Sequence, residues 1–186
     1  VAKKLQELGA KLIEADKLGH LAYQPHSHPW RMVTEKFGTD ILGENEEVDR
    51  KKLGAIVFSD PSALVILNSI MQPWIADMAR ELIAEYRKTR QKVVVLEAAI
   101  LIEAGWDDLV DEIWVTTAPE SQVVDRLGKR NNFSVNDIKA RINSQLPEEK
   151  RTNRAAVIIE NSGDLKNLSN QIETLWKFRI ETKKRG

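Results

Sequence analysis

Runs of consecutive apolar residues, separated by polar and glycine-containing segments, mark the expected strands of this chain. The clearest run is KVVVLEAAIL at residues 92–101, and shorter runs occupy residues 111–118 (DEIWVTTA) and 155–163 (AAVIIENSG). Continuous stretches of β-branched residues are typical of strands that are buried on both faces of a parallel sheet. A fourth run, KLIEAD at residues 11–16, ends in two carboxylates and predicts another strand.

The segments between these runs carry helical periodicity. Val1, Leu5 and Leu8 share one face of a first helix, which Gly9 is expected to end. Further helical patterns cover residues 31–38, 48–58, 61–90, 119–130, 135–146 and the segment after residue 164.

Capping residues mark several helix starts. Ser59 or Asp60 precedes Pro61, which suits the first turn of a helix. Asp164 occupies the equivalent position before the last helix. Pro73 lies inside the long pattern of residues 61–90 and is expected to bend or split that helix.

Strands that alternate with helices predict an α/β fold with a parallel sheet covered on both faces. The expected order places one helix between the second and third strands. In such sheets ligands bind beyond the carboxyl ends of the strands. Asp16, Glu97, Glu103 and the ENSG segment (160–163) lie at or just after expected strand ends. Carboxylates at these positions are also common helix caps, so both interpretations stay open.

Composition narrows the classes of function. The 186 residues are enough for one domain, and the 28 basic and 28 acidic residues leave no net charge to favour nucleic acid or membranes. The chain has no cysteine, as expected for a cytoplasmic protein without disulfides. The HSH segment at residues 26–28 suggests a metal ligand pair, but no third ligand is evident, so we predict no protein-held metal centre.

Several segments together resemble the dephospho-CoA kinase family. The matching stretches occur in family order over nearly the whole chain: LGAKLIEADKLGH, FGTDIL, VDRKKLGAIVF, IMQPWI, LIEAGWDDLVDEIWV, QVVDRLGKRN, ARINSQLPEEK and VIIENSG. The resemblance implies ATP-dependent phosphorylation of the ribose 3′-hydroxyl of dephospho-CoA, the last step of coenzyme A synthesis. It also implies ATP and Mg²⁺ as cofactors and a monomer or small homo-oligomer.

The resemblance further implies a P-loop kinase fold with three parts. Residues 1–20, 91–125 and 155–186 are expected to form the nucleotide-binding core. Residues 21–90 are expected to form a helical acceptor-binding insertion, and residues 126–154 a small helical lid.

The phosphate-binding motif of that fold, G-x-x-x-x-G-K-[ST], has no match in the sequence. The chain also opens within a helical pattern and has no capping residue before it. We therefore expect that the sequence is truncated at its N-terminus and that the first strand and the phosphate loop precede Val1. A protein that truly lacks the loop is the alternative.

Asp16 matches the catalytic carboxylate of the family, the second acid of a D-x-D motif. The resemblance implies that it accepts the proton of the attacking hydroxyl or orients that hydroxyl. The alternative is that Asp16 only caps the following helix. Glu14 stands at the first acid of the motif, where the family usually has aspartate, and is expected at the substrate and its Mg²⁺.

Residues 126–154 are rich in basic side chains, which number eight against three acids: Arg126, Lys129, Arg130, Lys139, Arg141, Lys150, Arg151 and Arg154. A solvated helical surface is the ordinary explanation. The resemblance instead implies a lid whose guanidinium groups bind phosphate oxygens. Arg141 matches the lid arginine and is expected at the γ-phosphate, Arg130 is the second choice, and Arg126 is expected to be more structural.

Four further positions carry expectations from the resemblance. Glu97 is expected to order Mg²⁺ through water, and Glu103 and Arg50 are expected near the acceptor, each with a structural alternative. Asn161 and Gly163, in the ENSG segment, are expected to lie alongside the adenine of ATP.

Three rival hypotheses stay open. The chain is expected to be a kinase of dephospho-CoA, but another P-loop nucleoside or nucleotide kinase shares these features. A binding module that retains the acceptor site without ATP use is the alternative outside enzymes. A domain of a bifunctional coenzyme A synthase is also compatible with the sequence.

Overall fold

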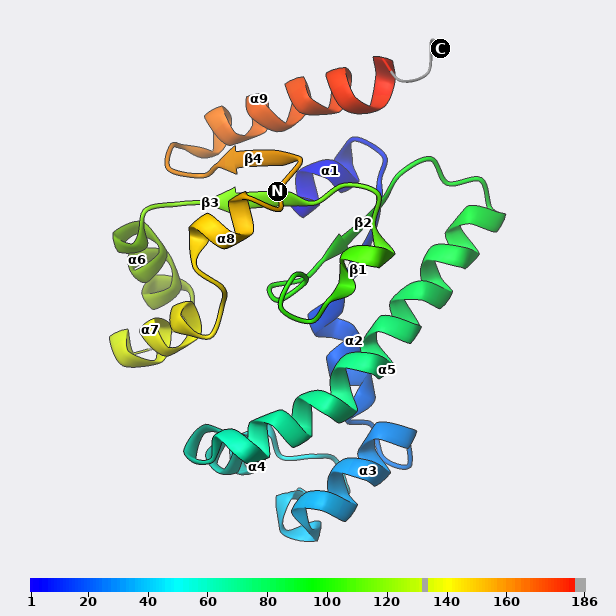
Figure 1. Ribbon diagram of the computed structural model, residues 1–186, viewed down its shortest axis with the longest axis vertical. Helices are drawn as coiled ribbons and strands as arrows, with labels where there is room; N and C mark the ends of the chain where they lie inside the picture. The colour runs from blue at the N-terminus through cyan, green and yellow to red at the C-terminus, as the bar shows by residue number, and fades with distance from the viewer. Residues whose placement is uncertain (132–133, 183–186) are drawn as a thin grey trace. The chain divides into compact units, whose positions relative to one another are not determined.

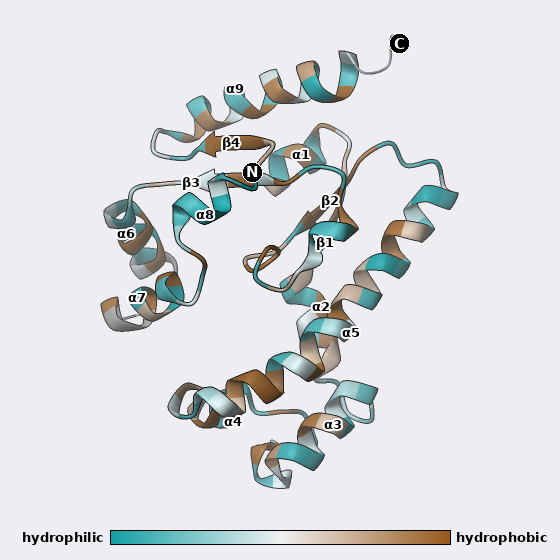
Figure 2. Ribbon diagram, viewed as in Figure 1, coloured by the Kyte–Doolittle hydropathy of each residue, from teal (hydrophilic) through white to brown (hydrophobic). Residues whose placement is uncertain are grey.

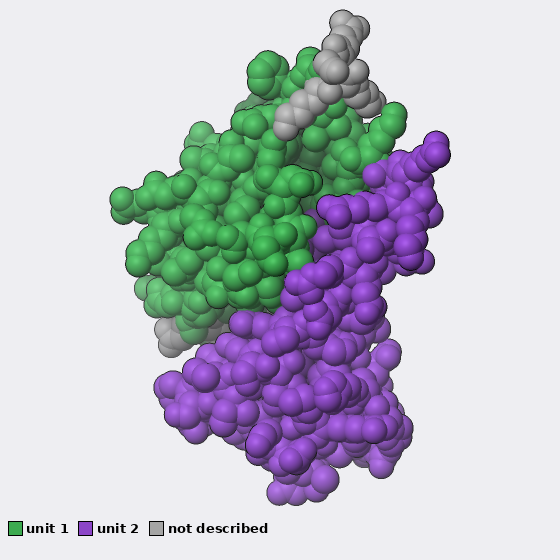
Figure 3. All heavy atoms as spheres, turned by 45° about the vertical axis from the view of Figure 1, so that its right-hand side comes forward, with its two compact units in different colours: residues 1–12, 92–95, 99–186 green, residues 13–91, 96–98 purple. Residues whose placement is uncertain are grey.

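Short strands and longer helices alternate along the chain (Figure 1). The computed structural model describes residues 1–131 and 134–182, without the side chains of residues 130, 131, 136 and 137. The chain divides into two compact units (Figure 3). Unit 1 comprises residues 1–12, 92–95 and 99–186, and unit 2 comprises residues 13–91 and 96–98. No helix within these described residues is both long enough and apolar enough to span a bilayer.

Unit 1 is built on a parallel pair of strands. β3 (Trp114–Thr117) pairs with β4 (Val157–Glu160), with Trp114 opposite Val157 and Thr117 opposite Glu160. The apolar residues of β4 stand out in Figure 2, but the expected burial of both faces is wrong here, because Val157 and Ile159 are buried whereas Ile158 is exposed. This pairing brings both carboxyl ends to the same edge.

Two helices bury their apolar faces in the core of unit 1. α1 (Ala2–Glu7) and α9 (Leu165–Trp176) pack against each other, and α9 also contacts β4. Asp164 caps α9 by accepting a hydrogen bond from the backbone N–H of Asn167, as expected. The buried cluster comprises Leu5, Ala10, Val157, Ile159, Leu168, Ile172 and Trp176.

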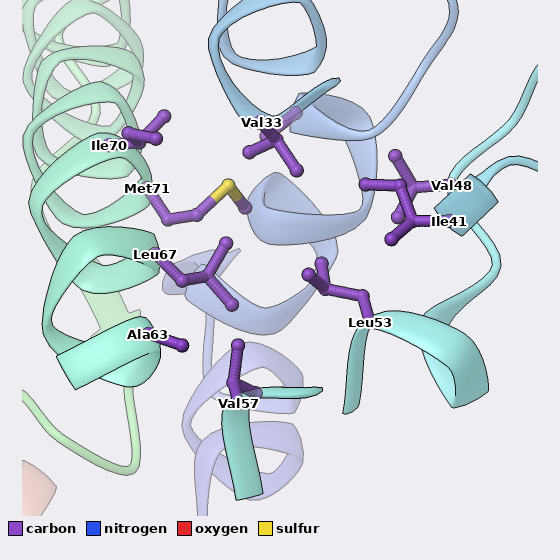
Figure 4. Close-up of a cluster of buried hydrophobic side chains, with 10 residues drawn as sticks. Val33, Ile41, Val48, Leu53, Val57, Ala63, Leu67, Ile70 and Met71 are labelled. Atoms are coloured by element: carbon purple, nitrogen blue, oxygen red, sulfur yellow. The ribbon is translucent and has the colours of Figure 1, made fainter. Parts of the chain in front are cut away.

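Unit 2 is helical and has its own core, which Figure 4 shows in close-up. Its elements are α2 (Ala15–Ala22), α3 (His28–Phe37), the 3-10 helix η1 (Thr39–Ile41), α4 (Arg50–Ser59) and α5 (Pro61–Lys88). α2, α3 and α4 each pack against α5. The buried cluster comprises Ala22, Val33, Ile41, Val48, Leu53, Val57, Ala63, Leu67, Ile70 and Met71.

The structure departs from the sequence-based expectation at two places along the chain. α5 runs through Pro73 as one 28-residue helix, so the proline does not split it; Ile70, Met71 and Ala76 are buried on either side and hold the backbone in place. Turns and the 3-10 helix η2 (Trp106–Leu109) replace the helix expected between the second and third strands. Gly105, with φ of 68°, breaks helical continuity there.

The strands are also shorter than the apolar runs, and in the described residues they form two pairs, β1–β2 and β3–β4. β1 is Lys11–Glu14 and β2 is Val94–Glu97. An apolar run predicts that a segment is extended and buried. It does not determine how many of its residues pair or with which neighbour.

Candidate active site

Two carboxylates lie at one edge of the β1–β2 pair. The backbone N–H of Lys11, the first residue of β1, donates to the carbonyl of Val93, just before β2, at 2.9 Å. The two strands therefore begin at the same end and run in parallel. Their last residues, Glu14 and Glu97, come to the same edge, where Glu14 forms an ion pair with Lys17 and Glu97 is exposed.

Asp16 follows immediately, because β1 passes directly into α2. Glu14 is the N-cap residue of α2 but makes no side-chain capping bond, and Asp16 is the second residue of the helix. The Asp16 side chain is exposed, and no hydrogen bond or ion pair engages its carboxylate within the described part of the chain. The capping alternative for Asp16 is therefore wrong. A negative charge in this first turn is still favourable, because it faces the positive end of the helix dipole.

His20 lies one turn further along α2, on the same helix face as Asp16. Its Nε2 is 2.7 Å from Nη1 of Arg50, the first residue of α4, although the two residues are 30 positions apart. Tyr23 is close to the same guanidinium. Burial raises the pKa of the Tyr23 hydroxyl, and the positive charge of Arg50 works against that rise.

The family resemblance implies that Arg50 lies near the acceptor, but it assigns His20 no role. The signal that could have found it is the four-residue spacing from Asp16, which puts both side chains on one face of a helix. The contact with Arg50 has no such local signal, since it depends on how α2 and α4 pack in unit 2.

In unit 1, two side chains of α6 (Glu120–Asn131) hold the loop after β4. Arg126 donates to the carbonyl of Asn161 at 2.7 Å and to that of Gly163 at 3.5 Å. Gln122 donates to the carbonyl of Ser162 at 3.0 Å. The side chains of α6 thus fix the loop through its backbone carbonyl groups. No hydrogen bond within the described residues involves the side-chain amide of Asn161.

Glu103 forms a hydrogen bond with the backbone in the second half of the segment that is expected to form the lid. Its Oε1 accepts a hydrogen bond from the backbone N–H of Leu146 at 2.7 Å. The carbonyl of the same leucine accepts from Nε of Arg151 at 3.1 Å. Leu146 lies between α7 (Val135–Asn143) and α8 (Glu148–Thr152), so Glu103 and Arg151 fix that connection from both sides.

Several basic residues of segment 126–154 have partners in the fold. Arg126 and Arg151 bind backbone carbonyls, Lys129 pairs with Asp125, and Arg154 pairs with Asp107. These side chains are nonetheless mostly exposed, so a solvated basic surface and a phosphate-binding segment both stay open. Arg141 lies in the last turn of α7 and is exposed; the side chain of Arg130 lies outside the described residues.

The histidine-rich segment does not gather ligands. Nε2 of His26 is 3.7 Å from Glu46, and its ring packs edge-on against Trp30 with centroids 5.3 Å apart. Across the residues that the structure describes, no three His, Asp or Glu side chains are grouped to hold a metal ion.

An α/β fold with an exposed carboxylate just after a strand, unpartnered among the described residues, and an arginine-rich helical segment after β3 is typical of nucleotide-dependent phosphotransferases. Comparison with known proteins narrows this class. The family model described as dephospho-CoA kinase matches residues 1–167. The chain belongs to the dephospho-CoA kinase family.

Curated relatives agree with the family model. The chain is 38% identical to the dephospho-CoA kinase of Carboxydothermus hydrogenoformans over 187 residues, which cover 99% of this chain and 91% of that protein. It is also 38% identical to the enzyme of Geobacter sulfurreducens, covering 97% and 91%.

Solved structures show the same fold. A Thermus thermophilus protein superposes with a TM-score of 0.76 at 26% identity, covering 95% of this chain and 88% of the other. The dephospho-CoA kinase of Campylobacter jejuni superposes with a TM-score of 0.71 at 24% identity, covering 97% and 90%. The expected α/β kinase fold is therefore confirmed.

Proposed function

We propose that this protein transfers the γ-phosphoryl group of ATP to the ribose 3′-hydroxyl of dephospho-CoA, which yields coenzyme A and ADP. The observation that carries the proposal is the exposed Asp16 carboxylate, which follows β1 directly and has no protein partner among the described residues. Membership in the dephospho-CoA kinase family supplies the substrate class.

Asp16 acts on the nucleophile. The 3′-oxygen attacks the γ-phosphorus while the bond from that phosphorus to the β–γ bridging oxygen breaks, and ADP leaves. The hydroxyl proton passes to the Asp16 carboxylate, which is close enough to solvent to release it afterwards. A carboxylate committed to a cap or an ion pair would have less freedom to accept that proton.

Glu14 and Glu97 fit a Mg²⁺ ion that enters with ATP. Kinase sites hold Mg²⁺ through one or two carboxylates and the substrate phosphates, and the ion prefers oxygen ligands. Both carboxylates lie at the same edge of the β1–β2 pair. When bound, the ion neutralises charge on the phosphate oxygens.

Arginines of unit 1 serve the nucleotide. Arg141 is proposed as the γ-phosphate ligand, with Arg130 as a second phosphate contact, because guanidinium groups bind phosphate oxygens bidentately. Arg126 supports the loop that contains Asn161 and Gly163, and this loop is proposed to run alongside the adenine. Arg126 then acts as a support of the loop rather than as a ligand.

Unit 2 is proposed to bind the acceptor. Arg50 contributes a positive charge to this unit near Asp16, because it contacts His20, which lies one helical turn from Asp16. Glu103 is proposed to act near the acceptor by fixing the end of the lid segment, since one of its oxygens already binds Leu146. We further propose a cytoplasmic monomer or small homo-oligomer that binds neither nucleic acid nor membrane.

The test is a coupled assay of ADP release by the full-length protein with four acceptors: dephospho-CoA, adenosine, AMP and shikimate. A kcat/KM for dephospho-CoA at least about a hundredfold above the others is expected. A higher value with another acceptor would assign a different kinase activity. Calorimetry with ATP and Mg²⁺ distinguishes a kinase from a non-catalytic acceptor-binding module, because the module would show no heat of ATP binding.

A further inference from the structure

Arg50 is held by a neutral side chain instead of a carboxylate. Its Nη1 lies 2.7 Å from Nε2 of His20. An arginine side chain has only N–H donors, so Nε2 must accept this hydrogen bond. The imidazole is therefore neutral in this arrangement and carries its proton on Nδ1.

A neutral partner leaves the charge of Arg50 available. No carboxylate among the described residues lies within ion-pair distance of its guanidinium. Arg154 and Arg179 differ, because each is paired with a carboxylate of unit 1 that offsets its charge. Arg50 thus keeps its full positive charge and the donors that His20 does not use.

The contact is unsuited to a purely stabilising role. Both side chains are exposed, and exposed polar contacts add little to folding stability. What the contact does achieve is to restrict a long, rotamer-rich side chain to one orientation. Tyr23 lies near the same guanidinium, whose positive charge lowers the pKa of the Tyr23 hydroxyl against the rise caused by burial.

The held guanidinium lies beside the face of α2 that carries Asp16. His20 follows Asp16 by one helical turn, which is about 6 Å along the axis. In a nucleotide the 3′-hydroxyl and the 5′-phosphate lie on opposite sides of a single ribose ring. Because one ribose ring carries both groups, an acceptor whose 3′-hydroxyl meets Asp16 can place its 5′-phosphate groups within reach of Arg50, which contacts His20 one turn along α2 from Asp16.

We propose that His20 is a positioning residue, which presents Arg50 to the 5′-diphosphate of the acceptor while Asp16 meets the 3′-hydroxyl. This rests on the proposed function, since it names the group of dephospho-CoA that unit 2 recognises. The geometry that carries it is the 2.7 Å contact between His20 and Arg50 on the Asp16 face of α2.

The test measures steady-state kinetics of the full-length enzyme with His20→Phe, His20→Gln and, as a matched control, His26→Phe. Phenylalanine keeps a ring but removes the acceptor, so KM for dephospho-CoA should rise about tenfold. The kcat and the KM for ATP should change less than about twofold. Glutamine supplies an acceptor oxygen and should restore most of the affinity, and His26→Phe should leave KM unchanged.

A double-mutant cycle with Arg50→Ala identifies the route of the effect. Because His20 acts through Arg50, His20→Phe should add nothing to KM once Arg50 is alanine. A similar rise in KM from His20→Phe in both backgrounds would overturn the proposal, as would failure of glutamine to rescue. Melting temperatures within about 2 °C of the parent would exclude a folding defect as the cause.

The outcome separates this inference from the proposed function. If Arg50→Ala raises KM for dephospho-CoA and His20→Phe does not, His20 has no positioning role but the acceptor site stands. If neither variant affects KM while Asp16→Asn abolishes turnover, the diphosphate is bound elsewhere and the inference fails alone. If dephospho-CoA is not phosphorylated at all, the proposed function itself fails.

Discussion

Among single residues, Asp16 is the most relevant to the proposed reaction, because its carboxylate is exposed. The residue lies in the first turn of α2, just after a strand end, and does not cap that helix. Most exposed carboxylates are only surface charges, but this one shares an edge with Glu14 and Glu97 and a helix face with His20. Family membership and this placement together are the reasons for proposing Asp16 as the base.

The first prediction concerns Asp16→Asn. The amide keeps the size of the side chain but cannot accept the hydroxyl proton, so kcat should fall at least about a hundredfold. KM values should change little, because the substrates keep their other contacts. Glu35→Gln, the same chemical change on the exposed surface of α3, is the control and should keep full turnover. A loss of kcat smaller than about tenfold would remove Asp16 as the base.

The second prediction concerns Arg141→Ala. A guanidinium that stabilises the transferring phosphoryl group contributes mainly in the transition state, so kcat should fall about a hundredfold or more. Lys139→Ala removes a positive charge from the same helix and should reduce kcat less than about threefold. Comparable losses in both variants would show that only the total charge of the segment matters.

Among the helices and strands, α4 is important because its first residue is Arg50. Asp49 caps this helix by accepting hydrogen bonds from the backbone N–H groups of Lys51 and Lys52, at 2.8 and 3.3 Å. These two bonds hold the pKa of the Asp49 carboxyl below its usual value of 3.8. The cap therefore fixes the start of α4, from which the Arg50 side chain extends.

The third prediction concerns Asp49→Asn and follows from this lowered pKa. A carboxyl whose pKa is lower in the folded state stabilises the fold above its unfolded pKa, near 3.8, and loses that contribution as the pH falls through the folded value. An asparagine at this position would cap the helix without titrating. Urea unfolding at about pH 7 and about pH 3 should therefore show a smaller loss of stability on acidification in the variant than in the parent.

Equal losses of stability in the two proteins would contradict the prediction, because the Asp49 cap would then contribute nothing that depends on pH. Asp40→Asn is a useful control in the same unit. Asp40 makes no hydrogen bond or ion pair through its side chain within the described residues, so this variant should respond to acid as the parent does.

Across the whole molecule, the chain buries two separate apolar clusters. Ile172 is 1% exposed in the cluster of unit 1, and Ile41 is 1% exposed in the cluster of unit 2. The two clusters share no residue. Each unit therefore has its own source of hydrophobic stabilisation.

The fourth prediction uses this matched pair. Ile172→Ala and Ile41→Ala should each destabilise the protein by about 2–5 kcal/mol, through lost burial and the cavity that remains. Hydrogen exchange should accelerate mainly in β4 and α9 for the first variant and mainly in α3 and α4 for the second. Identical exchange patterns in the two variants would show that the units unfold only together.

The amino-acid sequence alone was enough to identify the class of the protein and the type of most elements. Apolar runs, helical periodicity and caps such as Asp60 and Asp164 act through neighbours in the chain, and the structure contains both caps. Ordered motifs likewise identified the family, and from it comes the proposal for Asp16. A local signal was wrong between β2 and β3, where turns replace the expected helix, and of the two outcomes expected at Pro73 the split does not occur.

The meeting of distant groups, by contrast, became visible only in the folded chain. The His20–Arg50 contact, the support of Asn161 by Arg126 and the bond between Glu103 and Leu146 join residues 30 to 43 positions apart. Their geometry depends on how helices and strands pack, which no periodicity along the chain encodes. Local interactions thus choose each element, whereas burial of apolar surface between elements determines which side chains become partners.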